Sequence, residues 1–478
     1  MKFKTMSVIF IFLLFLTATF ATDFTPYDLL IDKGLDELTN YDFLPKTNKL
    51  TKQEAQYDLD MLEYILKKGY SGYFFKNKDY IDQQLQKVQA DVLANFANGE
   101  EFIFIRDFFN IISKIAVKIP DNHFSIAKFA WDDESQTLDS RSNDSDVELM
   151  KLGRNIAADE TKRCYKLDLD TYTYKGRTIP VLGINDFPVS GHEKWKGLAK
   201  IAKKLRKYGA FVIDIRGVTG GSSLPKDFIN SFLSKEVSRD LLKVRYLQSP
   251  EALALRVSQY KLHGFLENDF DKNVYEVIKD RQAEFEEAIA QNGLEELKFT
   301  EPYYKLNIRG NAKENYKGKI IILTDNFVGS EAEDFLYCFL KLKDVLNVKV
   351  FGDNTTGAFH FGGIGSTLLK NSKFWIYVGT RFVELENGEF IEKKGFKPDV
   401  YAKIVRKHDL ITEYFDGMED DFNLILAGNE SSAESYMTLK HDFDELQGEY
   451  SNFSDQAFWY ATGIVEEAIE LFDEDIWN

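Results

Sequence analysis

The sequence predicts an α/β protein with a largely parallel sheet. Short apolar runs typical of buried strands recur along its 478 residues, and segments with helical periodicity lie between several of them. This alternation favours parallel strands that are joined by helices. The strand-like runs are 179–184, 210–215, 319–324, 348–351 and 374–378. We expect the sheet core to occupy about residues 165–230 and 316–402.

Helices are predicted in the part of the chain that precedes this core. Thr51 and Glu54 form a capping box before an apolar periodic run, and Gly69 stands where that run stops. Similar periodicity covers 81–98 and 101–117. We therefore expect an N-terminal helical domain at residues 22–123.

Composition divides the rest of the chain into three parts. Residues 124–176 are polar and acidic, which predicts a linker or a small β element. Residues 177–402 hold the core, with a helix-rich insertion at about 226–315 that is either a lid over a site or a plain packed insertion. The segment 403–478 is acidic and aromatic, and we expect it to be helical.

The N-terminus has the features of a secretory signal. Lys2 and Lys4 precede an apolar run at 8–16, which is too short to span a bilayer that needs about 20 residues. Mostly small residues then lead to Ala21. Residues 1–21 therefore predict a cleaved signal peptide, and the alternative is a short membrane anchor. We expect a periplasmic or extracellular protein with no membrane span after cleavage.

Net charge and cysteine placement argue against two kinds of ligand. The formal net charge of −17 disfavours nucleic acid, because phosphate binding needs clustered lysine and arginine. Cys164 and Cys338 have no Cys or His neighbours at metal-binding spacing, and Cys338 lies in an apolar run that predicts a buried thiol. We expect no metal and no cofactor. The sequence predicts no oligomeric state.

Ser330 is the first candidate for chemistry. It follows the strand-like run 319–324 and precedes a helix-like segment, which places its hydroxyl at a helix N-terminus. Backbone N–H groups and the helix dipole can stabilise a developing oxyanion there, so the position suits a nucleophile. The alternative is a capping box formed with Glu333, which requires no chemistry.

A second candidate is the segment 214–221, which reads Asp-Ile-Arg-Gly-Val-Thr-Gly-Gly and carries a strand into a glycine-rich turn. Glycines let backbone N–H groups come close to an oxyanion or a phosphate. The glycine spacing does not match the dinucleotide-binding fingerprint. The alternatives are a simple tight turn and a structural ion pair between Asp214 and Arg216.

Two further residues are candidates for acid–base or supporting roles. His123 follows Asp121 at the exit of the helical domain, and histidine is the usual general base near neutral pH. Glu392 opens the segment Glu-Lys-Lys-Gly-Phe-Lys-Pro-Asp. The alternatives are a structural or exposed histidine and a solvated acid before a strand.

In this order, the segments resemble the C-terminal processing (tail-specific) serine peptidases and their tricorn-core and retinoid-binding-protein relatives. The family pattern Asp-x-Arg-Gly-Asn-x-Gly-Gly is matched by 214–221 at all but one position, and Ala-Ser-Ala-Ala-Glu is mirrored by 329–333. Gly-Glu-x-Thr-x-Gly is matched by 352–357, and Glu-x-x-Gly-x-x-Pro-Asp by 392–399. The resemblance covers about 179–402. It implies a ClpP/crotonase-like fold and serine peptidase activity on a peptide or protein substrate.

Two branches of that family use different bases. The processing branch places a lysine just after the Thr-x-Gly turn, where this chain has Ala358. The tricorn-like branch takes a histidine from an upstream Asp-x-His segment, which 121–123 matches. The resemblance therefore implies the tricorn-like arrangement.

Roles follow from this resemblance. Ser330 is the implied nucleophile, His123 the implied general base, and Glu392 a member of the supporting hydrogen-bond network. The implied oxyanion donors are the backbone N–H groups of Gly220 or Gly221 and of Glu331. The supporting residues are Asp121, Asp214 and Arg216.

Two departures from the family pattern bear on function. Residues 124–176 are too few for the peptide-binding PDZ module of the processing branch. Val218 stands where the family has an asparagine. The alternative function is a non-catalytic protein that uses the same fold to bind a ligand or a peptide, as the retinoid-binding relatives do.

Overall fold

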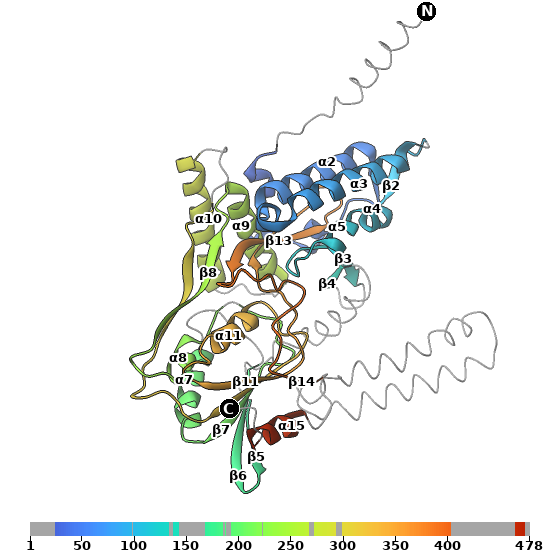
Figure 1. Ribbon diagram of the computed structural model, residues 1–478. Helices are drawn as coiled ribbons and strands as arrows, with labels where there is room; N and C mark the ends of the chain where they lie inside the picture. The colour runs from blue at the N-terminus through green and yellow to red at the C-terminus, as the bar shows by residue number, and fades with distance from the viewer. Residues whose placement is uncertain are drawn as a thin grey trace, which may run out of the picture. The chain divides into compact units, whose positions relative to one another are not determined.

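The computed structural model describes residues 24–97, 99–132, 137–142, 168–184, 187, 193–221, 223–266, 272–292, 299–402 and 464–473 (Figure 1). The chain divides into two compact units. The first unit comprises Met1–Arg163, Leu242–Lys305 and Ala358–Lys393. The second unit comprises Cys164–Leu241, Leu306–Gly357 and Lys394–Asn478. Each unit is therefore assembled from three stretches of the chain.

The second unit is built on a sheet whose described strands follow the order β14-β11-β10-β7-β6-β5. The strands are β5 (Asp168–Tyr174), β6 (Arg177–Gly183), β7 (Ala210–Asp214), β10 (Lys319–Thr324), β11 (Asn347–Gly352) and β14 (Val400–Tyr401). Neighbouring strands are parallel, except that β5 and β6 form an antiparallel pair. The prediction of a largely parallel sheet is confirmed for this unit.

The two central strands place the candidate site segments at one edge of this sheet. Strand β10 reads Lys-Ile-Ile-Ile-Leu-Thr and is buried after its first residue, as a strand covered on both faces requires. Strand β7 is buried throughout. Asp214, the last residue of β7, lies in register with Leu323 of β10. The turns that follow these parallel strands therefore begin side by side.

Helices cover both faces of the sheet. They are α7 (Glu193–Leu205), α8 (Lys226–Asn230), α11 (Glu331–Leu340) and α15 (Ile464–Glu470), which continues into the 3₁₀ turn η7 (Leu471–Asp473). Ala468 and Ile469 of α15 pack with alternate strand residues such as Val212. On the other face, Phe211 stacks on Phe232, and Phe335 of α11 contacts the helix α8 (Figure 1).

The first unit contains most of the described helices. They are α2 (Lys52–Tyr64), α3 (Lys78–Ala97), α4 (Ile105–Ile112), α5 (Lys114–Lys118), α9 (Pro250–Leu266) and α10 (Lys272–Asn292). Shorter turns are the 3₁₀ helices η1 (Pro26–Leu29), η2 (Leu35–Glu37) and η3 (Asn40–Phe43), and the π-helical turns η4 (Ile65–Gly69) and η5 (Tyr73–Asn77). The predicted capping box is confirmed, since the Thr51 hydroxyl accepts from the Glu54 N–H and the Glu54 carboxylate accepts from the Thr51 N–H.

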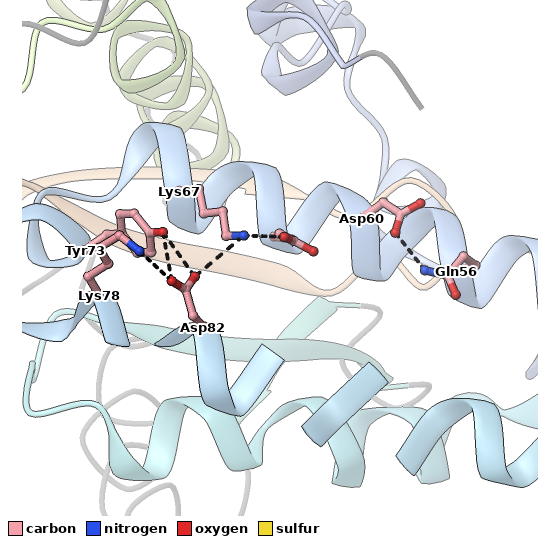
Figure 2. Close-up of polar contacts among 7 residues, drawn as sticks. Gln56, Asp60, Lys67, Tyr73, Lys78 and Asp82 are labelled. Atoms are coloured by element: carbon pink, nitrogen blue, oxygen red, sulfur yellow. Dashed lines mark hydrogen bonds and ion pairs between the residues drawn. The ribbon is translucent and has the colours of Figure 1, made fainter. Parts of the chain in front are cut away.

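Polar contacts tie the π-helical turns to α3. The Asp82 carboxylate accepts hydrogen bonds from the Lys78 Nζ at 2.7 Å and the Tyr73 hydroxyl at 3.1 Å (Figure 2). The Lys67 Nζ lies 3.6 Å from the same carboxylate. The Lys78 hydrogen bond, joined by the tyrosine and Lys67, holds the pKa of Asp82 below its usual value. The same view shows Gln56 donating to Asp60 within α2.

An antiparallel sheet completes the first unit. Its described strands follow the order β4-β3-β13-β8-β9, and β12 also pairs with β13. They are β3 (Ser125–Asp132), β4 (Thr137–Ser142), β8 (Ser238–Tyr246), β9 (Tyr303–Arg309), β12 (Phe361–Leu368) and β13 (Trp375–Glu384). A separate two-stranded pair joins β1 (Lys49–Thr51) to β2 (Phe102–Phe104).

Three expectations need correction. The run 374–378 was expected in the parallel core, but β13 pairs antiparallel with β12, β3 and β8. The helix-rich insertion at 226–315 also contains strands β8 and β9. The start of the predicted helix at 101–117 is the strand β2. In each case cross-strand pairing with distant segments determines the structure, and local periodicity does not report such pairing.

Several expectations fall on residues outside the described ranges. These are the signal peptide at 1–21, much of the acidic segment 124–176, Cys164, and most of the tail at 403–478. The described residues of the predicted N-terminal domain lie in the first unit, and the predicted core at 177–402 is divided between the two units. Among the described residues, no helix combines the length and the apolar character that crossing a membrane requires.

Candidate active site

Ser330 occupies a tight turn between β10 and α11. Its backbone has φ 53° and ψ −124°, a conformation that non-glycine residues rarely adopt and that is strained. Its side chain makes no capping hydrogen bond to α11. The Glu333 carboxylate instead accepts from the Thr355 hydroxyl and, at 2.9 Å, from the Gly357 N–H. The capping-box interpretation of Ser330 is therefore wrong.

The glycine-rich turn after β7 is fastened to the serine turn by hydrogen bonds. The Asp325 Oδ1 accepts from the Gly217 N–H at 3.1 Å and from the Phe327 N–H at 3.0 Å. The Gly329 N–H donates to the Val218 carbonyl at 3.1 Å. One buried carboxylate and one backbone hydrogen bond thus hold the two turns together.

Asp214 and Arg216 form a buried, two-pronged ion pair at the start of the glycine-rich turn. Arg216 Nε lies 2.9 Å from Asp214 Oδ1, and Nη2 lies 2.6 Å from Oδ2. The Arg216 N–H also donates to the same carboxylate. Bidentate pairing of this kind gives geometric specificity, so the pair fixes the direction in which the chain leaves the sheet.

Gly220 lies directly against Ser330. A Cβ atom added at Gly220 would lie 2.7 Å from the Ser330 Cβ and 3.2 Å from its Oγ, and the backbone φ is +131°. A Cβ atom added at Gly221 would lie 2.2 Å from the Phe187 carbonyl oxygen. Only glycine fits at these two positions, and the backbone of the turn consequently comes close to the serine.

In the first unit, three side chains from two distant segments converge. The ligand-capable atoms of Asp121, His123 and Glu392 all lie within 4.8 Å of one another. Asp121 and Glu392 are buried, and the His123 side chain is 11 % exposed. The His123 Nδ1 lies 3.8 Å from the Asp121 Oδ1, which also accepts from the His123 backbone N–H at 2.6 Å.

Glu392 joins the histidine segment to a second loop. Its Oε1 accepts from the Asn122 N–H at 3.1 Å. Its Oε2 accepts from the Phe359 N–H at 3.2 Å and the His360 N–H at 2.9 Å. A carboxylate with three backbone donors is firmly held in place, which fits a supporting role better than proton transfer.

Asp121 is a buried acid that also has a tyrosine partner. Burial raises its pKa to about 6, although the hydroxyl of Tyr70 and the backbone N–H of His123 act in the opposite direction. Tyr70 is itself fully buried, and burial beside this carboxyl raises the pKa of its phenol. The acid, the phenol and the histidine backbone thus form one buried network.

His360, three residues after the end of the Thr-x-Gly turn, has a structural role. Its Nδ1 lies 2.7 Å from the Val383 carbonyl oxygen, and its Nε2 accepts from the Ile391 N–H at 2.9 Å. The ring is therefore a neutral imidazole with its proton on Nδ1 and both nitrogens bonded to the backbone. This leaves His123 as the better placed candidate for a base.

Comparison with known proteins identifies part of the chain. Residues 178–402 match the model of peptidase family S41. This segment is a family S41 peptidase domain. The matched residues, just under half of the chain, support a peptidase function. No curated protein matches the chain.

Solved structures similar to the chain include peptidases. Mature CPAF is 14 % identical with a TM-score of 0.46, and the match covers 73 % of this chain and 92 % of that one. The photosystem II D1 C-terminal processing protease is 12 % identical with a TM-score of 0.38, covering 74 % and 94 %. A lipoprotein from Streptococcus agalactiae is 13 % identical with a TM-score of 0.35, covering 76 % and 96 %.

The S41 match and the observed sheets and helices confirm the predicted α/β class and ClpP/crotonase-like core. The S41 domain includes Ser330, the glycine-rich turn and Glu392, whereas Asp121 and His123 precede it. Within the second unit, the structure brings Ser330 together with the glycine turn. Within the first unit, it brings His123 together with Asp121 and Glu392.

Asp325 and Tyr70 are site residues that sequence reasoning missed. Asp325 directly follows β10, and an acid at the carboxyl end of a central parallel strand is a signal that could have been used. Tyr70 follows a π-helical turn and carries no comparable signal, because its contact with Asp121 joins residues far apart in the sequence.

Proposed function

We propose that the protein is an exported serine peptidase that cleaves peptide bonds through an acyl-enzyme. In this mechanism the Ser330 Oγ bonds to the scissile carbonyl carbon while His123 takes the hydroxyl proton. His123 then gives that proton to the leaving amine as the C–N bond breaks. Water repeats the sequence on the ester and regenerates the serine.

The developing oxyanion needs donors that are already in place. The backbone N–H groups of Glu331, at the N-terminus of α11, and of Gly220 or Gly221 are the proposed donors, because Gly220 contacts the serine within the same unit. Fixed donors of this kind require no reorganisation during the reaction. Asp325 supports them by holding both turns.

Asp121 and Glu392 orient the proposed base, His123. Asp121 lies beside the His123 Nδ1, and Glu392 holds the adjoining backbone at Asn122. A carboxylate near Nδ1, here 3.8 Å away, favours the tautomer that carries its proton on Nδ1, which leaves the Nε2 lone pair to accept the serine proton. Asp121 and Glu392 are thus positioning residues in this mechanism.

The observation that carries the proposal is the backbone of Ser330. A serine held at φ 53° in a strand–turn–helix connection, in an S41 domain and without a capping role, has no evident structural reason for its strain. Strained backbone of this kind concentrates at functional sites. The geometry resembles the exposed nucleophile turns of other hydrolases.

A fluorophosphonate probe tests the proposal directly. We expect stoichiometric labelling of the folded chain, with the adduct found on Ser330 by peptide mass spectrometry. Labelling is expected to disappear in Ser330→Ala and in heat-unfolded wild-type protein, whereas Ser330→Ala should keep the wild-type circular dichroism. A folded wild-type chain that is not labelled and digests no peptide in a library would support the non-catalytic binding protein instead, for which Val218 is the sequence argument.

Export rests on residues 1–21 alone. We propose that the mature chain begins after Ala21 and lies outside the cytoplasm, in the periplasm or the medium. N-terminal sequencing of the chain recovered from cells tests this. An intact Met1 on the accumulated protein would contradict it.

A further inference from the structure

The cluster of Asp121, His123 and Glu392 has a second chemical capacity. One imidazole nitrogen and two carboxylate oxygens face one another within 4.8 Å, in a largely buried place. The ligands come from the loop after α5 and from the segment after β13, both in the first unit. We propose that these three side chains bind one divalent transition-metal ion of the zinc type, and that the bound ion switches the peptidase off.

The donor set suits such an ion. One imidazole with two carboxylates and an open fourth position is a ligand combination that zinc accepts, whereas calcium and magnesium prefer all-oxygen sites. Ligands about 2.1 Å from a tetrahedral ion lie about 3.4 Å apart. The His123 Nδ1 and Asp121 Oδ1 are already 3.8 Å apart, and a pair at the 4.8 Å limit must close by about 1.4 Å.

The carboxylates are also held as metal ligands usually are. Backbone N–H groups of Asn122 and His360 fix Glu392, and the backbone N–H of His123 fixes Asp121. Such outer hydrogen bonds orient ligands and tune their affinity. The two acids are also close in space, so a divalent cation would relieve their mutual repulsion.

A bound metal ion inhibits because it occupies the nitrogen lone pair that would otherwise accept the proton. A neutral imidazole has one nitrogen lone pair, because its other nitrogen carries the proton. A metal ion on either nitrogen occupies that lone pair, and the ring then cannot accept the proton of Ser330. This consequence rests on the proposed function, whereas the metal site itself does not.

The two claims are separated by measuring binding in an inactive chain. Zinc chloride is titrated calorimetrically into Ser330→Ala protein, which cannot digest itself. We expect one site per chain with a dissociation constant in the micromolar range or below. Adding His123→Asn should weaken this site by at least about a hundredfold, and Asp121→Asn by at least about tenfold.

His263→Asn is the matched control, because His263 is a half-buried histidine of the same unit whose ring contacts Trp375. It should bind zinc like the parent. Weak zinc-binding sites elsewhere are present in every variant, so they do not change the differences in zinc affinity between variants. Circular dichroism and thermal melting establish that each variant is folded, and Asp121→Asn provides a second test if His123→Asn is not.

The wild-type chain supplies the functional readout. Zinc at saturating concentration should slow fluorophosphonate labelling at least tenfold, and a chelator should restore it, while magnesium has no effect. Equal zinc binding with and without His123, or no binding at all, overturns the site. Zinc binding that depends on His123 in a chain that never labels or cleaves leaves the site standing and overturns the peptidase proposal and its inhibition.

Discussion

Replacing His123 by alanine is expected to lower kcat for peptide hydrolysis by about 10⁴-fold, because the serine would lose its proposed base. The loss should appear in kcat rather than in KM, since the imidazole contributes little to binding the substrate in its ground state. Fold should be retained, because the hydrogen bond from residue 123 to Asp121 is made by the backbone. Steady-state kinetics with a fluorogenic peptide, chosen from a library digest by the wild-type chain, measures the effect.

His263→Ala is the control for this experiment. His263 lies on α9 in the same unit, so its loss should leave kcat within about twofold of wild type if catalysis depends on His123 and not on histidine content. Residual activity of His123→Ala within tenfold of wild type would show that another group is the base. His360 would then be the next residue to replace, although both of its ring nitrogens are bonded to the backbone.

Gly220→Ala is expected to be the second most damaging substitution outside the nucleophile. The added methyl group would lie 2.7 Å from the Ser330 Cβ and 3.2 Å from the Gly329 carbonyl oxygen, at a φ of +131° that L-residues rarely adopt. The turn must shift, and with it the serine and the proposed N–H donors. We expect activity to fall by at least about a hundredfold. The free energy of unfolding should fall by only about 1–3 kcal/mol.

Gly209→Ala is the matched control in the same unit. Gly209 is exposed, and a Cβ atom added there meets no atom within 4 Å. Activity and the denaturant midpoint of this variant should stay close to wild type. If Gly220→Ala labels with the fluorophosphonate probe at the wild-type rate, the proposed coupling between the glycine turn and the nucleophile is wrong.

Local sequence carried much of the information about the second unit. Strand β10 is a continuous run of isoleucine and leucine, and its bounds, Lys319–Thr324, are those that the sequence predicts. Strand β7 was also predicted, because burial on both faces is a local pattern. The prediction that Ser330 begins a helix was correct for the same reason.

Other features depend on contacts that no local pattern reports. Strand β13 has the same apolar character as the core strands, yet it joins the antiparallel sheet through pairing with β3 and β8. Glu392 was predicted to support the histidine, but its contacts with Phe359 and His360 could not be foreseen, since they involve backbone N–H groups on another loop. The capping interpretation is wrong because the Glu333 carboxylate accepts hydrogen bonds from Thr355 and Gly357 instead.

The unusual backbone angles of Ser330 restrict which side chains can replace it. At a φ of 53°, a side chain branched at its β carbon is strongly disfavoured by contacts with its own main chain, so threonine fits this position poorly although it carries the same functional group. Cysteine, which is unbranched, meets no such obstacle. If Ser330 is the proposed nucleophile, a laboratory exchange of its attacking atom therefore leads from oxygen to sulfur, and not from a primary to a secondary alcohol.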